Sequence, residues 1–399
     1  MTIVLAACQS SPSVRAPGGE RVSVHRAITT TSPEAQRAFD RGLLLMWGFD
    51  HEAAIAAFHE AAGLDPAAAM PWWGIALAHG PHINNPALDP EHARAAWAAL
   101  CEARSRAASA SPTERALIEA VAVRYSPNFA APRPALDQAY AEAMRGVWKA
   151  NANDADVGTW AAEALMDLHP WDLWTTAQEP KAGTEEILAV LERVLELAPE
   201  HPGACHLYIH AQEAGPSPER ALPAAERLSR NAGDAGHLVH MPAHVDARLG
   251  LWAEACLANR SAIAADARKA ATTSRTGFYR IYMAHNHHFL AWASMMEGNR
   301  AGALEAAHAM VDGVPPEFLS AMAPFVDGSM PVVLHVQVRF GLWEDVLATP
   351  KFAEELKVSN AVRHYARGVA LAAQGRVVDA DAELRAFDAV YATIEESRP

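Results

Sequence analysis

The feature of this sequence that most constrains its fold is a short turn that recurs through the second half of the chain. It consists of a glycine, a few linking residues and then an alanine or valine that lies in a following helix. It occurs at Gly250, Gly298, Gly341 and Gly375. Glycine readily adopts the left-handed conformation that ends an α-helix, so each motif predicts a helix end, a short link and a new helix. We therefore expect a succession of helix pairs.

The composition agrees with an all-helical chain. Of the 399 residues, 51% are hydrophobic and 20% are charged, and alanine dominates between the turns while strand-like alternation is almost absent. The net charge is -14, and no clustered basic stripe is present, so we expect no nucleic-acid partner. No run of 18 apolar residues occurs, so we expect no membrane-spanning helix.

One segment near the beginning carries a recognisable repeat pattern. GLLLMWGFDHEAAIAAFHEAAGLDP has a small residue at Gly42, an Ala54-x3-Phe58 contact pair, then Ala61 and Pro66. This is the tetratricopeptide (TPR) pattern: a small residue where the first helix meets the second, an A-x3-F contact, and a proline that ends the unit. We predict an all-α fold, an α-α superhelix (TPR-like solenoid) of about nine helix pairs. In such a solenoid the first helix of each pair lines the concave side.

The domain boundaries follow from the repeats and from the first residues. We expect the solenoid to span residues 32–399, with longer links at 81–90, 170–183 and 315–324. Residues 1–31 are expected to be a truncated lipoprotein signal and tether, since Leu5-Ala6-Ala7-Cys8 fits a bacterial lipobox and a stretch rich in Pro, Gly and Ser follows. A complete signal peptide needs a longer apolar stretch, so we expect the true start codon to lie upstream. These features predict an exported, periplasmic protein anchored to the membrane through a lipid on Cys8.

Histidines are concentrated in the middle of the chain, where nine of the 19 lie between His201 and His288. They occur in three segments, each expected to be the first helix of a repeat: CHLYIHAQEAG, GHLVHMPAHVDARLG and MAHNHHFLAW. Within each segment the spacing of three, four or seven residues places the side chains on one helical face. The residues on these faces are His206, His210 and Glu213, then His237, His240 and His244, and finally His285 and His288.

The spacing between segments repeats as well. His206 lies 34 residues before His240, and His210 lies 34 residues before His244, which is the TPR period. Counted from the turn glycines, the seven histidines fall at the second, fifth and ninth repeat positions, and Glu213 falls at the twelfth. These positions face the concave side, so the seven histidines, which we call the histidine ladder, are expected to point into one hollow.

The ladder predicts a transition-metal site. Neutral imidazoles on rigid helices bind Zn, Cu, Fe or Ni, and six to eight ligands suffice for one or two ions; we expect Cu, Fe or Zn. Glu163 and Asp167, one repeat upstream, are expected to flank the hollow as further ligands. Ring N–H groups need acceptors, for which Glu213, Asp246, Asp167 or backbone carbonyls are available. In the link that follows, Trp171 and Trp174 either cover the hollow or fill core between repeats.

Three functions remain open. The first is a metalloprotein, with a copper- or iron-dependent oxidoreductase as one form of it. The second is a TPR scaffold that binds a partner peptide or protein in the cell envelope without catalysis. A peptide clamp usually presents Lys, Arg and Asn, whereas the concave positions here carry His, Glu and Trp, which favours the metal. The third is metal storage or delivery. Motifs for nucleotide binding or a nucleophilic serine are absent.

Four strings carry a family resemblance: WWGIALAHGPHIN (72–84), HLYIHAQEA (206–214), GHLVHMPAH (236–244) and AHNHHFL (284–290). On these strings the chain resembles a family of bacterial TPR proteins, many of them lipoproteins, whose segments contain GPNIN and PHN-x-HFL. His82 stands here in place of an asparagine and Ala284 in place of a proline, and both changes leave the histidine ladder complete. The resemblance implies the solenoid fold and the envelope location.

Overall fold

The structure is a computed structural model, and it describes residues 24–270 and 277–394. The described residues form α-helices and one short 3-10 helix. The elements are α1 (Pro33–Trp47), α2 (His51–Leu64), α3 (Met70–Ala78), α4 (Pro90–Arg106), α5 (Pro112–Ala122), α6 (Arg133–Ala150), α7 (Ala155–Met166), α8 (Thr184–Leu197), α9 (Pro202–Glu213), η1 (Pro218–Ala221), α10 (Leu222–Asn231), α11 (Gly236–His240), α12 (Pro242–Arg248), α13 (Trp252–Ala270), α14 (Tyr279–Glu297), α15 (Arg300–Asp312), α16 (Pro316–Ala321), α17 (Ala323–Val326), α18 (Val332–Arg339), α19 (Trp343–Ala348), α20 (Lys357–Ala373) and α21 (Val377–Tyr391).

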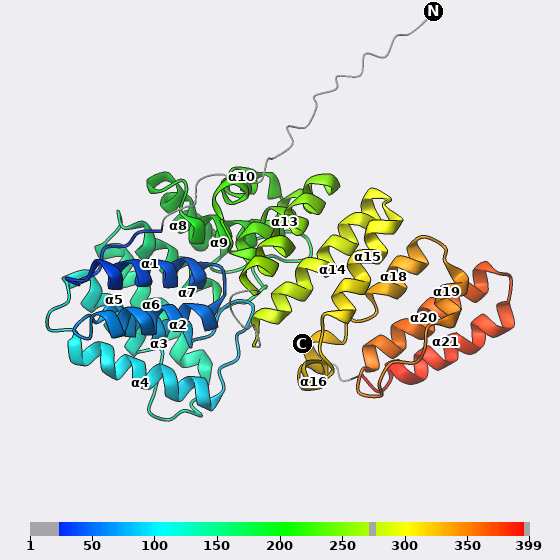
Figure 1. Cartoon of the computed structure of the whole chain (residues 1–399), viewed down its shortest axis with the longest axis horizontal. Helices are drawn as coiled ribbons and strands as arrows, with labels where there is room; N and C mark the ends of the chain where they lie inside the picture. The colour runs from blue at the N-terminus through cyan, green and yellow to red at the C-terminus, as the bar shows by residue number, and fades with distance from the viewer. Residues whose placement is uncertain (1–23, 271–276, 395–399) are drawn as a thin grey trace, which may run out of the picture.

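These helices pack as consecutive pairs, which confirms the all-α solenoid. Figure 1 shows the chain passing from α1 and α2, in blue, through α9 to α20 and α21 at the opposite end. Within the described ranges nine pairs are in contact: α1 with α2, α3 with α4, α5 with α6, α7 with α8, α9 with α10, α11 and α12 with α13, α14 with α15, α18 with α19, and α20 with α21. No helix of the described ranges is long and apolar enough to span a membrane.

Local sequence signals set the ends of many helices. Ser32 and Asp50 accept backbone N–H groups at the starts of α1 and α2, and Ser111 forms a reciprocal capping box with Glu114 at the start of α5. The four turn glycines all have positive φ, between 67° at Gly341 and 82° at Gly298. The recurring turn is therefore a left-handed helix end, as its sequence predicts.

The first pair is locked by the small residue and the aromatic residue of the TPR pattern. A Cβ added at Gly42 would lie 2.4 Å from Cε1 of Phe58, so only glycine allows this approach of α1 to α2. Phe58 also packs against Gly74 of α3, and its side chain is completely buried. The close contact thus joins two successive repeats.

The first seven repeats wind tightly enough to bring distant helices together. α1 contacts α9, and the ring of Trp47 stacks on that of Trp160 in α7, with 5.4 Å between the ring centroids. A Cβ added at Gly203, near the start of α9, would collide with the Trp47 ring. The C-terminal end of α1 therefore lies directly against α9, one of the helices of the histidine ladder.

Residues 24–31, which the sequence places at the end of the expected tether, contact the helices of the solenoid. Arg26 binds the carboxylates of Asp154 and Asp156, and Thr29 donates hydrogen bonds to Glu114. These contacts attach residues 24–31 to α5 and to the start of α7. The buried guanidinium of Arg26 needs carboxylate partners, and the two aspartates supply them. Cys8 and the lipobox lie outside the described residues.

Candidate metal centre

Six of the seven ladder histidines form two compact groups. The first group contains His206, His210 and His237, and the second contains His240, His244 and His285. In each group one nitrogen from each ring lies within 4.8 Å of the others. We call these groups the first and the second cluster. They are adjacent, since the ring centroids of His210 and His244 are 5.4 Å apart.

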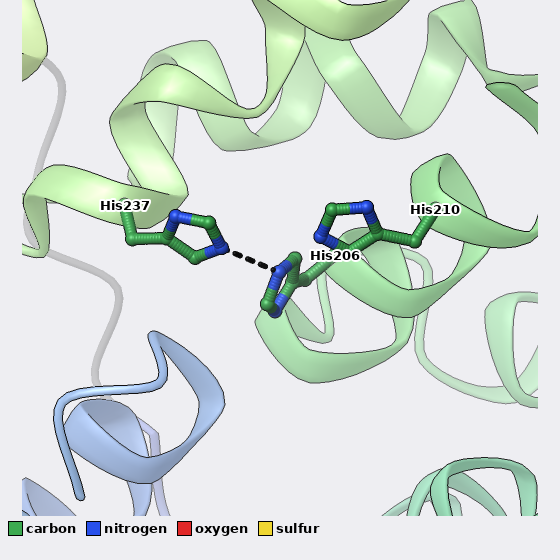
Figure 2. Close-up of side chains that lie close together, drawn as sticks. All are labelled: His206, His210 and His237. Atoms are coloured by element: carbon green, nitrogen blue, oxygen red, sulfur yellow. Dashed lines mark hydrogen bonds between the residues drawn. The ribbon is translucent and has the colours of Figure 1, made fainter. Parts of the chain in front are cut away.

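The first cluster joins α9 to α11. His206 and His210 are one turn apart on α9, and His237 approaches from α11 so that the three rings point toward one another (Figure 2). The Nε2 atoms of His206 and His237 are 3.1 Å apart. Nε2 of His210 is buried without a hydrogen-bond partner among the described residues. A buried nitrogen without a hydrogen-bond partner destabilises the folded state unless a proton donor or a metal ion binds it.

The second cluster joins α11 and α12 to α14. Nε2 of His240 lies 2.8 Å from Nε2 of His244, and the ring of His285 stands edge-on to that of His240 at 4.8 Å between centroids. His240 is completely buried, and His244 and His285 are partly exposed. The second cluster is therefore more accessible to solvent than the first cluster, whose three histidines are all buried.

The predicted single helix of GHLVHMPAHVDARLG is broken at Met241. Pro242 has no N–H to continue the hydrogen-bond ladder, so α11 ends at His240 and α12 begins at Pro242. The N–H of His244 bonds instead to the carbonyl of Met241, in a tighter turn. The break helps to divide the segment, with His237 in the first cluster and His240 and His244 in the second.

Each of four rings has its Nδ1 atom bound to an acceptor. His206 Nδ1 lies 2.7 Å from the carbonyl oxygen of Trp47, and His240 Nδ1 lies 2.8 Å from Oδ1 of Asn259. The amide nitrogen of Asn259 donates to the carbonyl of Ala255, which fixes Oδ1 toward the ring. Carbonyl oxygens only accept, so both imidazoles carry their proton on Nδ1.

Glu213 links the two clusters. Its Oε1 lies 2.7 Å from Nδ1 of His210 and its Oε2 lies 2.6 Å from Nδ1 of His244. Burial by itself would raise the pKa of Glu213, but the contacts with His244 and His210 lower it well below its usual range. The carboxylate therefore remains ionised and accepts a hydrogen bond from one ring of each cluster. This is the outer contact that metal-binding histidines commonly make.

The rings are held in the neutral form that a metal ion requires. Burial lowers the pKa of His206, His237 and His240 well below the usual value. Burial, followed by the charge of His244, lowers the pKa of His285 to about 3. With the proton on Nδ1, the Nε2 lone pairs of His206, His210 and His240 are free to coordinate.

The two carboxylates expected to flank the ladder lie elsewhere. Asp167 forms a buried ion pair with Arg124, with 2.7 Å between Oδ2 and the guanidinium, and neither Glu163 nor Asp167 belongs to a cluster. The long link after α7 does not shift them onto the histidine face, because Arg124 of the preceding repeat holds Asp167. The prediction of Glu163 and Asp167 as ligands therefore receives no support from their placement.

His288 also lies apart from both clusters. It lines a different pocket with Trp292 and His335, while His285, one turn earlier on α14, joins the second cluster. The side chains of the clusters are mostly buried, and His210 also lines a pocket. Their cover includes Phe49, whose ring centroid is 4.5 Å from that of His206 and 5.5 Å from that of His237.

A pocket of about 330 Å³ opens beside the first cluster. It is lined by His210, Glu213 and Arg248 together with apolar side chains of the 170–183 link. Trp171 is 57% exposed, stands edge-on to His210 at 5.0 Å and has a φ of 60°, which is unusual for a bulky residue. The indole of Trp174 donates to the carbonyl of Ala211. The link therefore covers the end of α9.

Sequence reasoning missed three contributors to the site: Asn259, the carbonyl of Trp47 and Phe49. Asn259 carried a usable signal, because it is a polar residue between Ala255 and Ala262 on the apolar face of α13. The backbone carbonyl of Trp47 and the apolar side chain of Phe49 carry no comparable signal in the sequence. They reach the histidines only because α1 packs on α9.

Comparisons with known proteins identify fold-level similarity only. No family model matches the sequence, and no curated protein matches it. The human IFIT1 dimer with PPP-AAAA has a TM-score of 0.44 at 13% identity, over 90% of this chain and 73% of that one. The Naa15/Naa10 structure bound to HypK-THB has a TM-score of 0.25 at 14% identity, over 90% and 59%. The P58(IPK) TPR domain has a TM-score of 0.23 at 11% identity, over 88% and 98%.

These similarities are low, and no activity or partner follows from them. The class of protein is defined by the helices themselves: an all-α, TPR-like solenoid. Its distinguishing feature is the pair of three-histidine clusters enclosed by the first seven repeats.

Proposed function

We propose that this protein is a metalloprotein whose two clusters each hold one transition-metal ion. The observation that carries the proposal is the 2.8 Å separation of the Nε2 atoms of His240 and His244, both of which have Nδ1 bound to an oxygen acceptor. A contact between these two Nε2 atoms needs a cation between them, either a proton shared by the rings or a metal ion, and the metal ion is the cation that we propose. The unpartnered Nε2 of His210 supports the same conclusion for the first cluster.

The ligand set narrows the choice of metal. Each cluster offers three imidazoles, and the oxygens of Glu213 are already used by ring N–H groups. Non-haem iron sites commonly combine two histidines with a carboxylate, whereas copper and zinc accept imidazole alone. Copper and zinc therefore fit these clusters better than iron.

Three protein ligands leave a coordination position open at each ion. Catalytic zinc sites have this arrangement, with water or substrate in the remaining position. The pocket beside His210 gives a small molecule access to the first cluster, which supports catalysis over storage. A bound copper ion would supply redox chemistry and a bound zinc ion would activate water. The protein itself fixes the orientation of the imidazole rings, keeps Glu213 ionised and limits the access of water to the two clusters.

Elemental analysis of the untagged protein tests the proposal. We expect about two ions of copper or zinc per chain, about one in His206→Ala and about one in His240→Ala. His287→Ala is the matched control, because His287 lies on α14 outside both clusters, and it should keep both ions. Helical circular dichroism should stay unchanged in all variants.

Two outcomes would overturn the metal site. One is equal metal content in folded His206→Ala, His240→Ala and the parent. The other is no bound metal in the parent, even after addition of copper and zinc salts. The second outcome would leave the TPR scaffold that binds a partner peptide as the function to pursue.

A further inference from the structure

The pocket beside the first cluster has the size and the walls of a binding site for a small organic molecule. Its volume is about 330 Å³, and it lies between the 170–183 link and the ends of α7, α9 and α12. This volume is at the lower end of the range of about 300–1,000 Å³ that is usual for ligand pockets. It suits a molecule that consists of one aromatic ring with a short side chain.

Most of the walls are apolar, and two of them are held in place by hydrogen bonds. The apolar lining residues are Ile83, Met166, Trp171, Leu173 and Trp174. The indole N–H of Trp174 donates to the carbonyl of Ala211, and the carbonyl of Leu173 accepts a hydrogen bond from the hydroxyl of Thr184. An apolar ligand therefore meets preformed walls at Leu173 and Trp174.

Trp171 offers a large aromatic surface that the protein leaves uncovered. Its side chain is 57% exposed, although it lines the pocket and stands edge-on to the ring of His210. An aromatic ring that packs on Trp171 would remove apolar surface from water on both partners and gain the attraction between two rings. The lining therefore favours an aromatic ligand over an aliphatic one of equal size.

Arg248 supplies a positive charge to the same lining. Its exposed side chain forms no hydrogen bond or ion pair within the ranges that the structure describes. Glu213 also lines the pocket, but its two oxygens accept hydrogen bonds from His210 and His244. A guanidinium binds a carboxylate through two parallel N–H groups, so Arg248 is available to an acid from solution.

His210 connects the pocket to the first cluster. It lines the pocket, yet it is only 6% exposed, and its Nε2 atom is buried without a hydrogen-bond partner among the described residues. Its Nδ1 atom is used by Glu213. A molecule in the pocket therefore lies against a ring that belongs to the first cluster.

We propose that this pocket binds a small aromatic carboxylic acid, with its carboxylate paired to Arg248 and its ring packed on Trp171 and Trp174. The role of this acid as the substrate of the first cluster rests on the metal ion proposed above, whereas its binding is measured separately. The negative charge of Glu213 is offset by Arg248 and, when the cluster is loaded, by the metal ion.

Calorimetric titration of the metal-loaded protein with phenylacetate tests the proposal, with benzoate and phenylpropionate as probes of other lengths. The comparison compounds are phenylacetamide, which lacks the charge, and acetate, which lacks the ring. We expect the aromatic acid to bind at least about 10-fold more tightly than either. Arg248→Gln should abolish the preference for the acid over the amide. Arg260→Gln, which changes an exposed arginine of α13 outside the pocket, is the matched control.

A second measurement uses the unaltered chain and does not depend on the folding of the variants. Oxidation of Trp171 by N-bromosuccinimide, mapped by mass spectrometry, should slow by at least about 10-fold at a saturating concentration of the acid. Trp292 is exposed and lines a different pocket, so it should react at the same rate with and without the acid.

The metal content of the same samples separates this inference from the proposed function. With about two ions per chain, no preference for any of the three acids over phenylacetamide would overturn the inference and leave the metal sites standing. An unchanged preference in folded Arg248→Gln, or equal oxidation of Trp171 with and without the acid, would also overturn it. A preference for the acid in protein that binds no metal would support the binding site and overturn the proposed function.

Discussion

The Nε2 atoms of His240 and His244 face each other at 2.8 Å, while the Nδ1 atom of each ring is hydrogen-bonded to an oxygen acceptor. A neutral imidazole has a single N–H, so when both rings are neutral neither has a proton for this contact. Protonating His240 is opposed by its burial, which lowers its pKa well below the usual value. Two nitrogens at about 2.0–2.1 Å from a tetrahedral zinc ion would be about 3.3 Å apart, so a bound zinc ion would move the two rings slightly apart.

Removing the acceptor of His240 should weaken the second cluster alone. In Asn259→Leu the Nδ1 proton of His240 loses its partner, so the ring is no longer held with Nε2 toward the metal. We expect metal binding at the second cluster to weaken by about 10-fold to 100-fold, with the first cluster unchanged. Competition with a chromophoric chelator measures both affinities.

Asn259→Asp is the control for that experiment, since it keeps an oxygen opposite His240. It should retain an affinity much closer to that of the parent. Equal affinity of the second cluster in Asn259→Leu and in the parent would show that the ring orientation does not depend on residue 259.

Glu213 should affect both clusters at once, because it accepts a hydrogen bond from His210 and another from His244. Glu213→Ala removes both acceptors, and we expect the affinity of each cluster to fall by about 10-fold to 100-fold. Glu213→Gln keeps a single acceptor oxygen and should impair one cluster more than the other. Metal titration of these variants beside Glu219→Ala, an exposed control on η1, measures the effect. A loss confined to one cluster in Glu213→Ala would contradict the bridging role.

The contact between Gly42 and Phe58 should govern the stability of the first repeat. Gly42→Ala places a methyl group 2.4 Å from the Phe58 ring, and such overpacking should lower the free energy of unfolding by about 1–3 kcal/mol. Gly146→Ala, in an exposed helical position with open space around it, should raise that free energy by about 0.5–1 kcal/mol. Urea unfolding measures both changes. Similar effects of the two substitutions would argue against the close packing of α1 on α2.

Glu163 should make the protein less stable as the pH rises. Burial, with repulsion from Asp167, raises the pKa of Glu163 to about 8, so the folded chain keeps a proton that the unfolded chain releases near its usual pKa. This contribution to stability is complete below the unfolded pKa of about 4.5 and is lost as the pH approaches 8. Glu163→Gln removes this titration. Between about pH 5 and pH 8 the free energy of unfolding of the parent should therefore fall relative to that of Glu163→Gln.

The measurement is urea unfolding of parent and variant across that pH range, with the exposed Glu305→Gln as control. The comparison cancels the many other titrating groups of the chain. Parallel pH profiles of the parent and Glu163→Gln would mean that Glu163 ionises at an ordinary pKa in the folded protein.

Much of the fold was accessible from the sequence because its signals are local. The turn glycines at Gly250, Gly298, Gly341 and Gly375 ended helices where their motif predicted. The small residue expected where the first helix meets the second is Gly42, and the structure shows that the side chain opposite it is Phe58. The single helix expected across Met241 was wrong, because the effect of Pro242 on the hydrogen-bond ladder outweighed the continuous histidine spacing.

The sequence by itself determined which side chains share a helical face, because the helical period and the 34-residue repeat are properties of the chain. Tertiary structure decided how those side chains divide into two clusters, why His288, Glu163 and Asp167 are absent from them, and which nitrogen of each ring faces inward. The physical reason is that a ring's tautomer depends on the acceptor opposite its other nitrogen. Those acceptors, Trp47 and Asn259, come from helices that only the winding of the solenoid brings into contact.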